Sequence, residues 1–105
     1  MAQFDVHRSP GRSSGVPFVV VVQGRSLDHL PTHLVAPLAD ADEFSRAPNA
    51  VPRFEVAGRQ VVLLPWQIRT VRAAALGQAV GSLADDASSA AIINAIDAVI
   101  TRPYG

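Results

Sequence analysis

The sequence predicts a mostly β domain with one C-terminal helix, arranged as a small barrel or a strongly bent antiparallel sheet capped by that helix. Three observations predict this class: short apolar runs separated by turn residues, one clear hairpin, and a helical apolar period near the end of the chain. The length of 105 residues fits a single domain spanning positions 1–105.

The first half of the chain contains three extended segments. Residues 3–7 alternate between polar and apolar side chains, and residues 9–15 are rich in turn formers, which indicates a strand and an exposed hairpin loop. Residues 18–22 are apolar on both faces, so we expect the core on one side and the helix or a second protomer on the other. Residues 33–38 are extended, and we expect Pro37 at a sheet edge or bulge because proline has no N–H.

The strongest hairpin signal lies in the second half. Residues 53–56 alternate, Ala57 and Gly58 supply a tight turn, and residues 60–64 form the returning strand. Before this hairpin, residues 39–51 break the pattern and predict a long surface loop.

The last segment, residues 85–100, has apolar side chains at the spacing of a helix with one buried stripe. Asp85 and Asp86 suit the N-cap and first turn. Pro103 ends the helix near Ile100 or Thr101, because a residue before proline avoids helical dihedral angles. The stripe comprises Ala87, Ala91, Ile92, Ile96, Val99 and Ile100, and the opposite face carries Asn94, Asp97 and Thr101. We expect the protein to act through that opposite face and the tail.

Composition excludes several function classes. The formal net charge is +0, which gives no electrostatic basis for binding DNA without a partner. There is no cysteine, so disulfides and thiolate chemistry are excluded. The start of the chain has no basic segment before an apolar run, and the longest apolar run is far shorter than the roughly 20 residues of a membrane span. We therefore expect a cytoplasmic protein with no membrane association.

No residue pattern indicates catalysis. His29 and His33 have the spacing of a helical metal pair, but Pro31 between them opposes a helix, so we interpret them as loop or strand histidines. The acidic run at 40–43 lacks the later glycine and glutamate of a calcium loop. Trp66 is expected in the core. With no nucleophile elbow and no glycine-rich phosphate loop either, we expect no enzyme, no cofactor and no metal.

Several segments together carry a family resemblance. They are residues 3–6 (Gln-Phe-Asp-Val), 18–23 (Phe-Val-Val-Val-Val-Gln), 34–39 (Leu-Val-Ala-Pro-Leu-Ala), the hairpin around Gly58, Leu76-Gly77 with Val80 and Leu83, and Asn94-Ala95-Ile96. In this order and spacing, over nearly the whole chain, they resemble the CcdB family of bacterial toxins.

The resemblance implies an SH3-like barrel with a C-terminal helix, assembled as a homodimer. It implies a toxin that traps DNA gyrase, through its A subunit, in the cleaved-DNA state, and a CcdA-like antitoxin that neutralises the toxin. The complex would repress its own operon, with DNA contacted only by the antitoxin, which agrees with the zero net charge.

The resemblance also implies where the gyrase and partner site lies. The positions are Leu27, Asp97, Ile100, Thr101, Arg102 and Tyr104. Active toxins of the family have an asparagine where this chain has Asp97, followed by a Phe-Trp-Gly-Ile tail. Here that tail is replaced by residues 100–103, and Arg102 places a charge where the family has glycine.

Two alternatives follow from these departures. One is a family member with the fold and antitoxin binding but weak or no gyrase poisoning, above all of the enterobacterial enzyme. The other is a ribonuclease toxin like the related MazF proteins, for which Arg8, Arg12 and Arg53 would have to converge.

Overall fold

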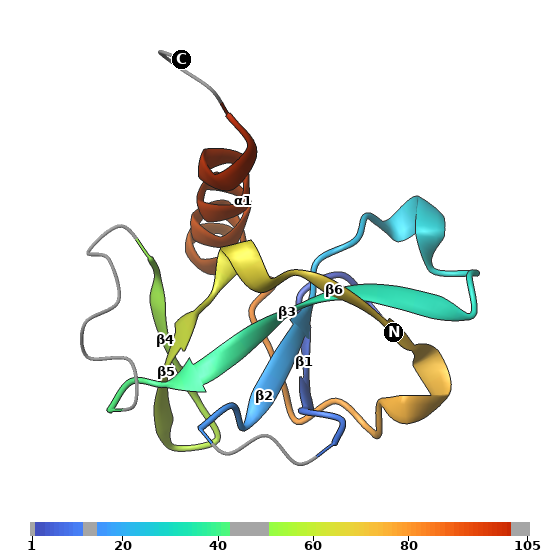
Figure 1. The fold of residues 1–105 in the computed structure, drawn as a ribbon, viewed down its shortest axis with the longest axis horizontal. Helices are drawn as coiled ribbons and strands as arrows, with labels where there is room; N and C mark the ends of the chain where they lie inside the picture. The colour runs from blue at the N-terminus through green and yellow to red at the C-terminus, as the bar shows by residue number, and fades with distance from the viewer. Residues whose placement is uncertain (1, 12–14, 43–50, 102–105) are drawn as a thin grey trace.

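The computed structural model describes residues 2–11, 15–42 and 51–101, which contain a seven-stranded sheet and one α-helix (Figure 1). The strands are β1 (Asp5–Arg8), β2 (Phe18–Val21), β3 (Thr32–Asp40), β4 (Arg53–Val56), β5 (Arg59–Leu63), β6 (Arg69–Arg72) and β7 (Gly81–Ser82), and the helix is α1 (Asp86–Ile100). Three 3₁₀ turns complete the list: η1 (Arg25–Leu27), η2 (Pro65–Gln67) and η3 (Ala73–Ala75).

The sheet curls into a nearly closed barrel. The strand order is β4-β5-β3-β2-β1-β7, with β6 paired to β3, and every pairing is antiparallel. The two ends of this order approach each other, because a Cβ added to Gly81 of β7 would lie 3.8 Å from Val56 Cγ1 of β4. The predicted class, mostly β with a C-terminal helix, is confirmed.

The β4–β5 hairpin closes through the predicted two-residue turn. Ala57 and Gly58 both have positive φ angles, of 50° and 78°, which is the signature of a type I′ turn between twisted strands. The register pairs Val56 with Arg59, so the turn leaves no residue unpaired at the end of the ladder.

The doubly apolar strand β2 is buried on both faces within one chain. Phe18 and Val20 belong to the main core cluster, and Val19 and Val21 to a second cluster with Leu76. The expectation that the helix or a second protomer covers the second face was therefore wrong. The segment after β6 covers that face, and β2 gives no reason to expect a dimer.

Strand β3 is the centre of the sheet, and its register with β2 is regular through the pair Val19 and Pro37. The expected position of Pro37 at a sheet edge or bulge was therefore also wrong. On one side β3 pairs with β2, and on the other it pairs first with β6, up to Val35, and then with β5, from Leu38. Pro37 lies where the partner changes, and its carbonyl accepts a 3.0 Å hydrogen bond from Leu64 N. In an antiparallel sheet, the N–H and the C=O of one residue point toward the same neighbouring strand. The side on which Pro37 lacks an N–H therefore faces the gap between β6 and β5, where no strand needs a donor.

The loop expected at residues 39–51 begins later than predicted. Asp40 still belongs to β3, where it pairs with Val61 and donates its N–H to Gly15 O at 2.8 Å. Asp40 also forms an ion pair with Arg59 at 2.7 Å, so it is not a solvated loop carboxylate. Residues 43–50, including Glu43, lie outside the described residues.

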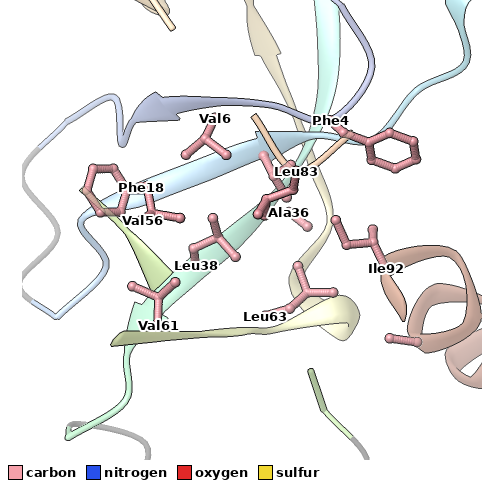
Figure 2. Close-up of a cluster of buried hydrophobic side chains, with 12 residues drawn as sticks. Phe4, Val6, Phe18, Ala36, Leu38, Val56, Val61, Leu63, Leu83 and Ile92 are labelled. Carbon is pink, nitrogen blue, oxygen red and sulfur yellow. The ribbon is translucent and has the colours of Figure 1, made fainter. Parts of the chain in front are cut away.

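Helix α1 covers the open side of the main core through its middle turns. Ile92 and Ala95 are buried, Ile96 is partly buried, and Figure 2 shows the Ile92 side chain directed toward Leu63 and the strands. The predicted stripe was correct in these turns and wrong at the ends. Ala87, Val99 and Ile100 are exposed, and the C-terminal end of the helix, with the last two of these residues, projects beyond the barrel.

The helix begins as the sequence predicts. The Asp85 carboxylate accepts a 3.0 Å hydrogen bond from Ser88 N, and Asp86 adds a negative charge in the first turn. The hydrogen bond from the Ser88 backbone lowers the pKa of Asp85 below its ordinary value of 3.8.

This cap predicts a pH dependence of stability. A carboxylate whose pKa is lower in the folded protein than in the unfolded chain stabilises the fold fully when the pH is above the unfolded-state pKa. That stabilisation is lost as the pH falls through the folded-state pKa. Asp85→Ala should therefore lower Tm at neutral pH, and the difference from wild type should shrink in acid. Thermal unfolding followed by circular dichroism measures both. A Tm difference that stayed constant down to the acid limit would contradict the charged cap.

Among the described residues, no helix has both the length and the apolar character needed to cross a membrane.

Candidate partner-binding site

The C-terminal end of α1 projects away from the barrel (Figure 1). Thr101 caps the helix in an extended conformation and donates its N–H to Asp97 O at 2.8 Å, which confirms the predicted helix end. Ile100 is 73% exposed, and Asp97 and Thr101 are exposed as well. Arg102 and Tyr104, the other two predicted tail residues, lie outside the described residues.

Exposed apolar side chains occur on this helix and on the turn that packs against it. They are Ile93, Val99 and Ile100 of α1 and Trp66 of η2, the turn that packs against α1. We call these four residues the helix-end surface. Several large apolar side chains exposed on neighbouring elements of a folded domain are typical of an interaction site.

Trp66 is 47% exposed, so the expectation that it lies in the core was wrong. The physical reason is local. Leu64 and Pro65 are both buried, and the tight 3₁₀ turn that begins at Pro65 directs the next side chain outward. Sequence reasoning therefore missed Trp66 as a surface residue, although proline at the start of a 3₁₀ turn was a usable signal.

Leu27 lies elsewhere on the molecule. It ends η1, is 42% exposed, and has the exposed side chains of Leu30 and Leu34 on the same loop and the start of β3. Figure 1 separates η1 from α1 across the width of the barrel. Within one chain, the structure thus does not bring Leu27 together with Asp97, Ile100 and Thr101.

Among the described residues, the charge at the C-terminal end of α1 is negative. The last turn of α1 has no basic side chain, and Asp97 adds its charge to the negative end of the helix dipole. A partner that offers an apolar pocket with basic groups at its rim would complement this arrangement.

The histidines do not form a metal pair. His29 is exposed in the loop after η1, whereas His33 is buried in β3 with its Nδ1 2.6 Å from Gln23 Nε2. In the part of the chain that the structure describes, no cluster of three or more His, Cys, Asp or Glu side chains is arranged to hold a metal ion.

The arginines named for a ribonuclease are only partly described. Arg8 is exposed on β1 and Arg53 on β4, two strands that are not paired with each other, and Arg12 lies outside the described residues. The convergence of these three side chains stays a prediction.

Comparisons with known proteins agree with this architecture. The family model described as "CcdB protein" matches residues 3–101. A similar solved structure is the Mycobacterium tuberculosis toxin MazF-mt6, with a TM-score of 0.76 at 16% identity, covering 95% of this chain and 99% of that one. Another is an endoribonuclease in complex with its cognate antitoxin from a mycobacterial species, with a TM-score of 0.73 at 15% identity, covering 100% and 97%.

At these identities the likeness to the two solved structures is one of fold, and no curated protein matches the chain. The family match has a firmer basis, because it extends over almost the entire sequence. It confirms the resemblance read from the motifs, from residue 3 to the end of α1. The chain belongs to the CcdB family.

Proposed function

We propose that this protein is the toxin of a type II toxin–antitoxin system, and that it inhibits DNA gyrase by trapping the complex of the enzyme with cleaved DNA. The target is the gyrase A subunit, and a CcdA-like antitoxin neutralises the toxin. The observation that carries the proposal is the exposed apolar end of α1 in a chain of the CcdB family.

The chemistry of the helix-end surface fits a protein partner. Interfaces have an apolar centre with aromatic and aliphatic anchors and a polar rim. Trp66 and Ile100 supply such anchors, and Asp97 supplies a charged rim. The protein would act by binding rather than by catalysis, without metal or cofactor.

The departures from the family tail define the expected specificity. Asp97 replaces a neutral asparagine, and Arg102 brings a charge that would have to be paired or kept in water at a closed interface. The protein should therefore trap enterobacterial gyrase weakly or not at all. Its own host's gyrase is the proposed target, because that partner surface can have changed together with the toxin.

A homodimer is the proposed assembly. Leu27 and the helix end lie apart in one chain, so a single partner reaches both most simply if they come from two protomers. Light scattering at micromolar concentration should give twice the 11.1 kDa chain mass. A monomer mass under these conditions would count against the dimer.

An antitoxin partner is supported by fold and family together. One solved structure of similar fold is an endoribonuclease in complex with its cognate antitoxin. Because the net charge of this protein is zero, we propose that its own antitoxin makes the contacts with DNA. The isolated protein should therefore not retard operator DNA in a gel.

A supercoiling assay tests the proposal. The purified protein is added to the host's gyrase, ATP and relaxed plasmid, with and without the proposed CcdA-like antitoxin. We expect the protein to abolish supercoiling and the antitoxin to restore it. Full supercoiling at a large excess of the protein would contradict the proposed target. RNA cleavage in a parallel reaction would favour the ribonuclease alternative.

A further inference from the structure

A buried side-chain amide joins the loop that carries Leu27 to the centre of the sheet. Gln23 lies two residues after the end of β2, directly before that loop. Its Oε1 accepts the Leu34 N–H at 2.9 Å, and its Nε2 donates to Leu27 O at 3.2 Å. These two backbone groups fix the orientation of the amide. The flipped form would place donor against donor at Leu34 and acceptor against acceptor at Leu27.

The same geometry fixes the protonation of His33. Gln23 Nε2 also lies 2.6 Å from His33 Nδ1, and the amide nitrogen can only donate. His33 Nδ1 must therefore accept, so the ring proton is on Nε2. His33 is 3% exposed and is the second residue of β3, where it pairs with Val71 of β6. The amide thus uses its carbonyl oxygen and both its protons on partners within the protein.

This network holds the first part of the loop. The hydrogen bonds of residues 24–30 are local, among them those from Leu27 N to Gly24 O and from Leu30 N to Leu27 O, and η1 has no buried residue. The far end of the loop is tied separately, because Pro31 O accepts the Ala73 N–H at 2.9 Å. In the described part of the chain, the hydrogen bond from Gln23 Nε2 to Leu27 O is the side-chain bond that ties the turn to the strands.

We propose that Gln23 is a positioning residue for the Leu27 loop and that protonation of His33 releases that loop. A proton on Nδ1 would face the Nε2 donor of Gln23, and it would charge a buried ring. Flipping the amide would repair the contact with His33 and break those with Leu27 and Leu34. Neither arrangement of the protonated form keeps all the hydrogen bonds, so the loop opens as pH falls.

Other ionisable groups lie on the elements around His33. They are Arg25, Asp28 and His29 of the loop, Arg69 and Arg72 of β6, and His7 of β1. Among the described residues none of them is hydrogen-bonded or ion-paired to His33, and His7 instead has Nδ1 2.9 Å from Gly77 O. The local response to pH is thus assigned to His33 and Gln23.

Nuclear magnetic resonance of the whole protein tests this without any partner. A long-range ¹H–¹⁵N spectrum at about pH 8 should show the His33 proton on Nε2. As pH falls from about 8 and the ring of His33 takes up its second proton, the exchange protection of the Leu34 amide should fall about tenfold or more. Protection of the Val80 amide, which is bonded to Val6 O, should stay constant.

Two variants sharpen the test. His33→Asn offers an acceptor oxygen near the Nδ1 position that does not titrate, so Leu34 protection should become independent of pH. Gln23→Leu should lower that protection at every pH. A proton on His33 Nδ1 at high pH, or Leu34 protection in wild type that does not change with pH, would overturn the proposal. Because no gyrase is present, this outcome is separate from success or failure of the proposed function.

Discussion

Ile92→Ala should lower the free energy of unfolding by about 2–5 kcal/mol, the usual cost of emptying a fully buried aliphatic site. Ile92 is 0% exposed and connects α1 to the barrel strands (Figure 2). The sheet cannot collapse readily into the space, because the central strands β5, β3 and β2 each pair with a neighbouring strand on both sides. Urea unfolding followed by circular dichroism measures the change.

Ile100→Ala is the matched control on the same helix. The same side chain is removed from an exposed position, so stability should change by no more than about 0.5 kcal/mol. Ile96→Ala should fall between the two, since Ile96 is partly buried. If Ile92→Ala cost as little as Ile100→Ala, the placement of α1 on the barrel would be wrong.

Ile100→Asp should weaken gyrase trapping by about 30-fold or more while leaving the fold intact. Buried apolar anchors in interfaces are worth about 2 kcal/mol or more each, and a charge in their place adds a desolvation cost. Ile100 is the most exposed large apolar side chain among the described residues, so the substitution removes no internal packing. The protein concentration that gives half-maximal trapping of cleaved DNA measures the effect.

Ala98→Asp provides the matched charge control. Position 98 is exposed on the same turn, but two residues earlier its side chain points about 200° away around the helix. Trapping should therefore change little. Equal loss in both variants would show that added charge near the helix end, rather than the apolar contact of Ile100, is what matters.

The fold was largely predictable because its signals are local. The Ala57-Gly58 turn and the Asp85 cap each require particular residues at particular positions, and both occur as expected. The position of Pro37 was not predictable in the same way. Whether β3 changes partner beside it depends on strands about thirty residues later in the chain.

The candidate site was less accessible to sequence reasoning. The helical period correctly marked Ile92, but it cannot show where the barrel beneath the helix ends, so Ile100 was placed in the buried stripe. Trp66 was missed because burial of an aromatic side chain depends on the direction of one tight turn. The distance between Leu27 and the helix end is a property of the barrel as a whole, which no local pattern contains.

The most direct measurement is a DNA-cleavage assay with the gyrase of the organism that encodes this protein. Supercoiled plasmid, gyrase and ATP are incubated with the wild-type protein, then treated with detergent and protease. The predicted result is linear plasmid in an amount that increases with toxin concentration. The linear plasmid should be absent when the cognate antitoxin is added. Deletion of residues 101–105 should reduce it. The account would be contradicted if no toxin concentration gave linear product. A standard gyrase poison, which should give linear product under the same conditions, serves as the positive control.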